Sequence, residues 1–466
     1  MKTAKKIWIT LVIVLITALG VGAAAWVIRD QLDRQRYLTE NVFMADGTPY
    51  ARDLEIIDLR GREVDVAYYE ELHGLLPEAT ILWDVPFQGG RLDSQTAELT
   101  LTTLSDADVE RLDYIRSLTT VHGEGCTDHD QLIALQLRRP EVRVCYRVAV
   151  GGKSYAQDTT RITVTGITDG DIQHLKYLTA LEELHLVEPK AAPAAIQALR
   201  DRGLTVTCEA DVLGTKVTDG MTHLDFEDIP LASIEDLRSL AYFPDLEQVF
   251  LGKCGYDNEA LAAYREEMRS QFKLVWTVQT GKLWTRTDDI FFMPVKYHVY
   301  YFHDEDTYNL RYCEDMICID LGHMTITDIS FVEHMPDLQY LILAHTTVLD
   351  IGPLASCKKL KFLELDNTAI MDYEPLLECT GLEDLNLGKT YGDEDIIAQM
   401  TWLKNLWWSA GKNNKAITKE RQEILSQALP NTYLELDTQS STAEGWRKLP
   451  HYYEQRDIFE MPYFTA

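Results

Sequence analysis

Hydrophobic and polar positions alternate with a fixed period in the last third of the chain. In and just after the stretch LASCKKLKFLELDNTAIMDYEPLLECTGLEDLNL, residues 354–387, several residues recur 22 positions later. They are three leucines, a cysteine and a threonine: Leu360, Leu363, Leu365, Cys357 and Thr368. A constant period in this range indicates a repeat architecture. The L-x-L core of each unit predicts a short strand with one buried face.

Aligned on this pattern, the C-terminal region divides into five units of nearly equal length. The steps between them are 22, 22, 22 and 21 residues, and they begin at Met316, Leu338, Leu360, Leu382 and Leu403. The three central units read L-x-x-L-x-L-x-x-T. We expect each unit to form one strand and then to return along the outside to the next strand.

This pattern resembles the leucine-rich repeats of internalin-like bacterial surface proteins over residues 316–410. The resemblance implies an α/β fold, a leucine-rich-repeat solenoid with a parallel β-sheet on its concave face. Regular 22-residue units are then expected in residues 298–437. Irregular, longer units with extra strands or hairpins are expected in residues 51–297.

The longer units have their own rhythm. Four β-like runs recur at intervals of 63, 62 and 68 residues, at Trp83, Tyr146, Cys208 and Trp276. A glycine follows each run by five or six residues: Gly89, Gly151, Gly214 and Gly281. Between these runs, paired strand patterns place Leu99 22 residues before Val121, and Leu224 25 residues before Val249. Each unit is therefore predicted to contain stacked strands and a hairpin that turns near its glycine.

Helix starts are predicted where a hydroxyl residue stands three positions before an aspartate. Ser105, Thr127 and Thr168 each have this spacing. In such a capping box the two side chains satisfy backbone amides that have no partner at the beginning of a helix.

The N-terminus carries a long apolar run. Residues 7–28, IWITLVIVLITALGVGAAAWVI, contain no charge and follow Lys2, Lys5 and Lys6. A run of this length spans a bilayer as a helix, and the preceding lysines favour a cytoplasmic N-terminus. We expect a cytoplasmic tail at 1–6, a transmembrane signal anchor at 7–28 and a stalk at 29–50. The alternative is a secreted protein, because Ala23-x-Ala25 resembles a signal-peptide cleavage site.

The charge of the chain limits its partners. Asp and Glu outnumber Lys and Arg by 74 to 44, which gives a net charge of -30. A surface this acidic repels phosphate backbones, so nucleic acid is not an expected partner.

Most candidate chemical sites have a structural explanation. Cys and Met alternate at one repeat position, Cys313, Met335, Cys357, Cys379 and Met400, which indicates a buried apolar slot rather than a zinc or redox site. The stretch HGEGCTDHD holds the zinc-ligand types His122, Cys126, His129 and Asp130, and a metal-dependent surface hydrolase using them is the alternative to a binding protein. The acidic loop at 302–309 is an alternative calcium site, although it lacks the spacing of a calcium loop.

Residues between the buried leucines are predicted to point outward from the concave sheet, because side chains alternate along a strand. Three aromatic residues there form a predicted exposed line, with polar side chains beside it. The candidate ligand-binding residues are Tyr340, Phe362, Glu364, Asp366, Asp384, Asn386, Asn405 and Trp407. Two alternatives remain open: a one-residue error of register, or coverage of these residues by the C-terminal tail.

That tail, residues 438–466, is polar and then aromatic, and it resembles the endings of membrane-anchored repeat proteins. So many aromatic residues are unlikely to stay in water, so we expect the tail to pack back on the last repeats. Together these features predict a membrane-anchored, extracytoplasmic protein without enzymatic activity, bound metal or cofactor. It binds a protein, peptide or glycan through its concave face. An architectural role in a cell-surface complex is a further alternative.

Overall fold

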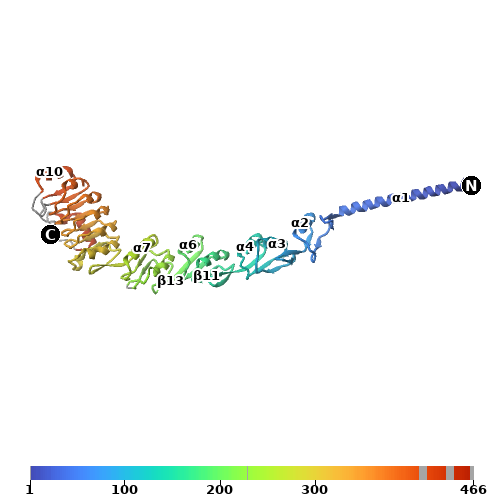
Figure 1. Ribbon diagram of the computed structural model, residues 1–466, viewed down its shortest axis with the longest axis horizontal. Helices are drawn as coiled ribbons and strands as arrows, with labels where there is room; N and C mark the ends of the chain where they lie inside the picture. The colour runs from blue at the N-terminus through green and yellow to red at the C-terminus, as the bar shows by residue number, and fades with distance from the viewer. Residues whose placement is uncertain (1, 228, 409–416, 437–444, 462–466) are drawn as a thin grey trace. The chain divides into compact units, whose positions relative to one another are not determined.

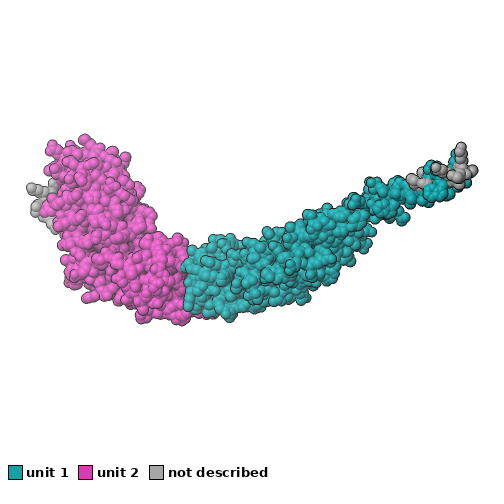
Figure 2. Space-filling view, turned by 45° about the vertical axis from the view of Figure 1, so that its right-hand side comes forward, with its two compact units in different colours: residues 1–206 teal, residues 207–466 magenta. Residues whose placement is uncertain are grey.

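The computed structural model covers residues 1–466 and describes all of them except 1, 228, 409–416, 437–444 and 462–466 (Figure 1). The side chains of residues 2–5, 12, 14, 16 and 17 are also not described. The chain divides into two units, residues 1–206 and 207–466, which Figure 2 colours separately.

Unit 1 begins with a long helix, α1 (Lys2–Glu40). Within the part of the chain that the structure describes, no helix combines the length and the apolar character needed to cross a bilayer. An antiparallel pair follows α1, and a parallel pair comes next: β1 (Asn41–Phe43) with β2 (Pro49–Ala51), and β3 (Ile56–Asp58) with β4 (Thr80–Leu82).

The rest of unit 1 alternates parallel strands with hairpins. Its later strands are β5 (Asp84–Phe87), β6 (Gly90–Asp93), β7 (Glu98–Thr100), β8 (Thr120–Gly123), β9 (Arg143–Val150), β10 (Lys153–Ala156), β11 (Arg161–Thr165) and β12 (Glu183–Val187). Its helices after α1 are α2 (Val66–Leu75), α3 (Asp106–Arg111), α4 (His129–Arg138), α5 (Asp169–His174) and α6 (Pro193–Asp201), with 3₁₀ turns η1 (Leu112–Tyr114) and η2 (Leu175–Tyr177). The predicted pairing of Leu99 with Val121 is confirmed in the parallel pair β7–β8.

Further strands of the same kind follow from the last residues of unit 1 into unit 2. They are β13 (Thr205–Val212), β14 (Thr215–Thr218), β15 (His223–Asp225), β16 (Gln248–Phe250), β17 (Lys273–Val275), β18 (Thr277–Thr280) and β19 (Leu283–Arg286). The 3₁₀ helix η3 (Ile234–Tyr242) and α7 (Asn258–Met268) connect β15, β16 and β17. Leu224 pairs with Val249 in parallel, as the 25-residue spacing predicted.

Hairpins turn at the predicted glycines. The pairs β5–β6, β9–β10, β13–β14 and β18–β19 are all antiparallel. In β9–β10 both turn residues are glycines with positive φ, +56° at Gly151 and +74° at Gly152. That conformation is open to glycine and strained for most other residues, which explains why glycines mark these turns.

The C-terminal part of unit 2 is a parallel sheet of short strands that stack in chain order (Figure 1). Among the described residues its order is β20 (Phe291–Phe292), β21 (Cys318–Asp320), β22 (Tyr340–Ile342), β23 (Phe362–Glu364), β24 (Asp384–Asn386), β25 (Asn405–Trp407) and β26 (Tyr433–Glu435). Ile319, Leu341, Leu363 and Leu385 are aligned across the sheet and fully buried. This ladder is the repeat core that the leucine spacing predicted.

Short helices return the chain behind the sheet. They are η4 (Pro294–Tyr297), α8 (Asp304–Thr307), η5 (Tyr308–Tyr312), η6 (Ser330–His334), η7 (Gly352–Ser356), η8 (Glu374–Glu378), α9 (Glu394–Ile397) and α10 (Lys419–Ala428). The Cys and Met residues of the shared repeat position follow these returns and are at most 1% exposed. After β26 come η9 (Trp446–Lys448) and α11 (Pro450–Ile458).

Candidate binding surface

The candidate residues lie on the concave side of β22 to β25, as the strand alternation predicted. Seven are within these strands, and Asp366 follows β23 by two residues. Phe362 is aligned with Tyr340 on one neighbouring strand and with Asp384 on the other. The register expected from the sequence is therefore correct.

The predicted exposure of these residues is wrong. Tyr340, Phe362 and Trp407 are 3%, 0% and 2% exposed, so they form no accessible aromatic line. The polar candidates Glu364, Asp366, Asp384 and Asn386 are buried too, and Asn405 is half-buried. The cause is the C-terminal part of the chain, which lies over the concave face as the alternative reading of the sequence allowed.

We call residues 445–461 the strap. Pro450 occupies the first turn of α11, where its lack of an N–H costs nothing and its fixed φ favours the helix. One side of the strap carries the buried aromatic residues Trp446, Tyr452 and Phe459. These three belong to one apolar cluster with Tyr340, Phe362 and Trp407.

Aromatic contacts join the strap to the sheet. The Trp446 ring lies 4.7 Å from that of Phe362 and 5.2 Å from that of Trp407, measured between centroids. At the other end of the strap, Phe459 meets Phe291 of β20 edge to face at 5.9 Å. The strap thus crosses the sheet from β25 to β20. Burial of large aromatic rings is the main apolar stabilisation available to such a segment.

Polar contacts fix the position of the strap. The indole N–H of Trp446 donates to Oε2 of Glu364 at 3.0 Å. Nδ1 of His451 lies 3.0 Å from Oδ2 of Asp384. Nζ of Lys296 donates to the carbonyl oxygen of Phe459 at 2.8 Å. Each bond joins a strap residue to a different part of the solenoid, so together they define one orientation.

Burial and the contacts with the strap change the acid–base properties of the concave face. Desolvation raises the pKa of Glu364 to about 7, against a smaller opposing effect of the Trp446 hydrogen bond. Desolvation likewise raises the pKa of Asp320 to about 6, although Arg447 and Arg456 of the strap act in the other direction. The hydrogen bond with Asp384 raises the pKa of His451.

Several buried polar groups of the concave strands and of the strap have no hydrogen-bond partner among the described residues. On the sheet these are the side-chain N–H₂ of Asn386 and the indole N–H of Trp407. On the strap, neither side-chain polar atom of Gln455 is bonded, although this residue is only 1% exposed. Leaving such a group unpaired costs about 1–3 kcal/mol.

A second polar cluster lies at the edge of the concave face. Nε2 of His345 is 3.1 Å from Oδ2 of Asp366, and its Nδ1 is 2.7 Å from Nδ2 of Asn367. The ring of His345 stacks on His323 with centroids 4.5 Å apart. Burial lowers the pKa of His345 and raises that of Asp366. The arrangement holds a histidine and a carboxylate together, with no nucleophile in the contacts that the structure describes.

The residues proposed for zinc have separate partners. His122 faces Glu98 and Glu124, and His129 bonds the carbonyl of Arg147. Asp130 pairs with Lys176 and Tyr177, and the Cys126 thiol faces Asp128. Within the described part of the chain, no three His, Cys, Asp or Glu side chains are grouped to hold a metal ion.

The acidic loop at 302–309 also has an architectural use. It forms the start of α8, where Asp306 accepts a hydrogen bond of 2.9 Å from the backbone N–H of His303. Asp304 accepts from the backbone N–H groups of Thr327 and Asp328. These carboxylates hold a helix start and the next repeat, rather than pointing together at one site.

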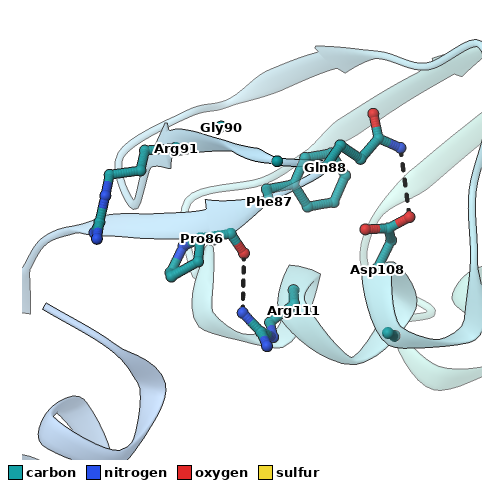
Figure 3. Close-up of a pocket in the computed structure, with 9 residues that line it drawn as sticks. Pro86, Phe87, Gln88, Gly90, Arg91, Asp108 and Arg111 are labelled. Carbon is teal, nitrogen blue, oxygen red and sulfur yellow. Dashed lines mark hydrogen bonds between the residues drawn. The ribbon is translucent and has the colours of Figure 1, made fainter. Parts of the chain in front are cut away.

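Unit 1 contains an open cleft of about 580 Å³ beside the β5–β6 hairpin. Figure 3 shows its lining, with Arg111 of α3 donating to the carbonyl of Pro86 at 3.2 Å and Gln88 reaching Asp108 at 3.5 Å. These polar groups of the cleft already bond to each other. The concave face, with its aromatic and ionic contacts to the strap, is therefore the stronger candidate for a binding surface.

In architecture, the C-terminal part of unit 2 is a leucine-rich-repeat solenoid. Parallel three-residue strands, a buried leucine ladder and 3₁₀ returns carry this assignment. No family model matches the chain, and no curated protein matches it.

Among solved structures, the chain is similar to an internalin C2 from Listeria monocytogenes, at 21% identity over 29% of this chain and 70% of that one, with a TM-score of 0.22. It is similar to the internalin InlF of the same species, at 16% identity over 63% and 87%, with a TM-score of 0.24. A leucine-rich-repeat protein of Leptospira interrogans matches at 12% identity over 72% and 93%, with a TM-score of 0.24. At these TM-scores the likeness carries no argument, so the fold assignment rests on the strand pairing of this chain.

Residues of the strap were not among the sequence candidates. Trp446, His451, Tyr452 and Arg456 lie in a stretch whose aromatic content matches that of the concave face. That match is the signal from which their position could have been found.

Proposed function

We propose that this protein is a binding protein whose leucine-rich-repeat solenoid recognises a protein or peptide partner through the concave face of β20 to β25. One observation carries the proposal: this face already holds a helical peptide segment, the strap, by aromatic, hydrogen-bond and ionic contacts. Clustered aromatic anchors surrounded by polar groups are typical of the centre of protein interfaces.

We further propose that the solenoid is held outside a membrane by residues 7–28. Support comes from the sequence, because this run of 22 residues has no charge and follows three lysines. Extracytoplasmic placement also agrees with a net charge of -30, which keeps such a surface soluble and away from nucleic acid.

The test compares partners captured from native membranes by three full-length proteins: wild type, Phe362→Ala, and Glu378→Gln as a surface control. Phe362 is fully buried under the strap, and the side chain of Glu378 is 65% exposed on the back of the solenoid. The proposal requires a protein that wild type and the control retain and that Phe362→Ala loses, with all three showing the same circular dichroism. Identical partners for all three would reject the concave face as the binding surface.

A further inference from the structure

The hairpins β5–β6, β9–β10, β13–β14 and β18–β19 share one exposed position. It is the second residue of the second strand, and its side chain is exposed in all four hairpins. The first three hairpins have a polar residue there: Arg91, Ser154 and Lys216. In β18–β19 the residue is Trp284, which is 50% exposed. The hairpin fold therefore does not require an aromatic residue at this position.

Trp284 lines a cavity of about 200 Å³ in unit 2. Tyr297 lines the same cavity and is 53% exposed. Phe291 and Phe292 of β20 add further aromatic surface, and Asp289 adds a carboxylate. Cavities with aromatic and apolar walls and a few polar groups are typical binding sites for small molecules. The unusual residue of the fourth hairpin is thus part of a cavity with this composition.

The two exposed rings of the cavity stand on packed backbone. Tyr297 ends η4, a 3₁₀ turn that begins at Pro294 and is closed by the left-handed residue His298, with a φ of +62°. The β18–β19 hairpin lies against the start of α8, since a Cβ on Gly281 at its turn would be 2.9 Å from Oδ1 of Asp306. Rings held in this way lose little conformational freedom when a ligand binds to them.

The charges around the cavity favour a neutral ligand. Asp289 lines the cavity and repels an anion. Two lysines already lie over lining rings: Nζ of Lys253 is 4.7 Å from the ring centroid of Trp284, and Nζ of Lys296 is 4.6 Å from that of Phe291. Neither lysine is among the described residues that line the cavity, but their charges weaken the attraction of these rings for another cation. A cationic ligand is therefore disfavoured as well.

The polar groups of the cavity suit a ligand with hydroxyl groups. Oδ2 of Asp289 accepts from the backbone N–H of Arg286 at 2.8 Å, and its Oδ1 has no partner among the residues that the structure describes. Within the same described residues, the hydroxyl of Tyr297 and the indole N–H of Trp284 have no hydrogen-bond partner either. One acceptor and two donors thus accompany the aromatic walls. A sugar ring matches both features, because its C–H groups pack on aromatic rings and its hydroxyls both donate and accept.

We propose that this cavity is a binding site for a neutral sugar, in which Trp284 and Tyr297 supply the stacking surface and Asp289 accepts from sugar hydroxyls. Its volume of about 200 Å³ is below the roughly 300–1,000 Å³ of sites for drug-sized ligands, so it suits a single sugar ring. The site lies outside strands β22 to β25, which carry most of the concave candidates, and it adds a second binding activity to the proposed function.

The experiment titrates the full-length chain with the methyl β-glycosides of glucose, galactose, N-acetylglucosamine and N-acetylgalactosamine. Saturation-transfer difference NMR detects binding through the C–H protons of each sugar. The detergent must have no sugar headgroup, because a glycoside detergent would compete for the site. At least one of the four sugars should bind the wild-type chain, with the strongest saturation on the C–H protons of one ring face, since that face packs on the aromatic rings.

Trp284→Lys is the main variant, because Lys216 stands at the equivalent position of β13–β14 and the hairpin fold accepts a lysine there. It should weaken sugar binding at least about tenfold, which is the contribution of a stacked aromatic ring. Tyr301→Ala is the matched control, because Tyr301 is 80% exposed and is not among the described lining residues, so it should keep the wild-type affinity. Asp289→Asn keeps an oxygen for the N–H of Arg286 and should weaken binding at least about threefold.

The inference falls if none of the four sugars binds, or if Trp284→Lys and Tyr301→Ala bind a sugar equally well. It also falls if tetramethylammonium binds more tightly than every sugar in a manner that depends on Trp284, because the cavity is then a cation site. Partner capture that is lost in Trp284→Lys, with no sugar bound, would assign the cavity to protein docking instead.

A last comparison separates this site from the concave face. Sugar binding should be unchanged in Phe362→Ala, since Phe362 is not among the described residues that line the cavity. Loss of sugar binding in that variant, with an unchanged circular dichroism spectrum, would place the sugar on the concave face and overturn the inference. If no sugar binds while partner capture still depends on Phe362, the inference fails and the proposed function stands.

Discussion

The indole N–H of Trp446 donates a hydrogen bond of 3.0 Å to the carboxylate of Glu364, which lies 82 residues earlier in the chain. Both side chains are buried, and the bond ties the strap directly to Glu364. Protonation or ionisation of the Glu364 carboxylate therefore changes the stability of the strap on the sheet.

Replacing Glu364 with glutamine should tighten the strap at alkaline pH. Gln retains an oxygen that accepts from Trp446 but has no charge to desolvate. Since burial raises the pKa of Glu364 from 4.5 to about 7, the ionised carboxylate is disfavoured in this buried position above that pH. Hydrogen exchange of the α11 amides at pH 8 should be slower in Glu364→Gln than in wild type. Glu378→Gln should leave it unchanged, and faster exchange in Glu364→Gln would contradict the account.

The strap should open as pH rises from 5 to 8. With the strap in place, desolvation raises the pKa of Asp320 from 3.8 to about 6 and that of Glu364 from 4.5 to about 7. The hydrogen bond with Asp384, which the strap supplies, raises the pKa of His451. A group whose pKa is raised when the strap lies on the sheet binds its proton more tightly in that state. Its contribution to holding the strap is complete below its ordinary pKa, and it is lost as pH rises past the raised value.

The other charged groups facing these three do not reverse the direction of this effect. Arg447 and Arg456 lower the pKa of Asp320, but by less than desolvation raises it, and Asp384, Glu454 and Glu383 raise the pKa of His451. Protection of α11 amides, corrected for the intrinsic pH dependence of exchange, is the measurement. Greater protection at pH 8 than at pH 5 would show that a different set of groups controls the strap.

The β9–β10 turn offers a test of the hairpin architecture in unit 1. A Cβ on Gly151 would lie 2.3 Å from Cγ1 of Val164, whereas a Cβ on Gly152 would meet nothing within 4 Å. Both glycines have positive φ, so each alanine substitution strains the backbone by about 1 kcal/mol. Gly151→Ala should cost about 1–3 kcal/mol more because of the added overlap. Equal losses in thermal unfolding of the two variants would mean that Val164 does not pack against this turn.

Much of the fold could be predicted because the buried positions repeat. The spacings of Leu99 with Val121 and of Leu224 with Val249 became parallel strand pairs, and the alternation of side chains placed Trp407 on the concave side. Neighbouring strands pair in register only if apolar residues recur at the same intervals, and these intervals can be measured in the sequence.

One predicted helix cap was wrong, at a position where a tertiary contact binds a neighbouring residue. Capping boxes formed at Ser105 and Thr168 as predicted, but α4 begins at His129, with Asp128 at its N-cap instead of Thr127. The Asp128 carboxylate is drawn to the backbone N–H of Leu104, at 2.8 Å, and this bond fixes the chain one residue later.

The repeat spacing could not predict that the strap covers the candidate binding residues. The strap belongs to no repeat, so the spacing that locates Phe362 says nothing about Trp446. Only the aromatic content of the sheet and of the tail connects the two, and a match of composition does not define a register.

The cysteines should behave as buried apolar residues. None of the eight forms a disulfide, and Cys145 alone among them is not buried. Burial raises the pKa of the Cys357 thiol and raises that of Cys379 to about 12, so thiolate is scarce at neutral pH. Alkylation of the native protein at pH 7.5 should modify Cys145 first and Cys379 only after denaturation. Rapid modification of Cys379, or a mass change on reduction, would contradict this packing.

The most direct test of the central claim is a zero-length carbodiimide cross-link in the wild-type, full-length monomer. Nζ of Lys296 lies 3.1 Å from Oε2 of Glu460 when the strap is on the concave face, and Nζ of Lys358 lies 2.7 Å from Oε2 of Glu378 within the solenoid. Mass spectrometry should find both the Lys296–Glu460 and the Lys358–Glu378 cross-links. Finding the second without the first would contradict the claim that the C-terminal segment occupies the concave face.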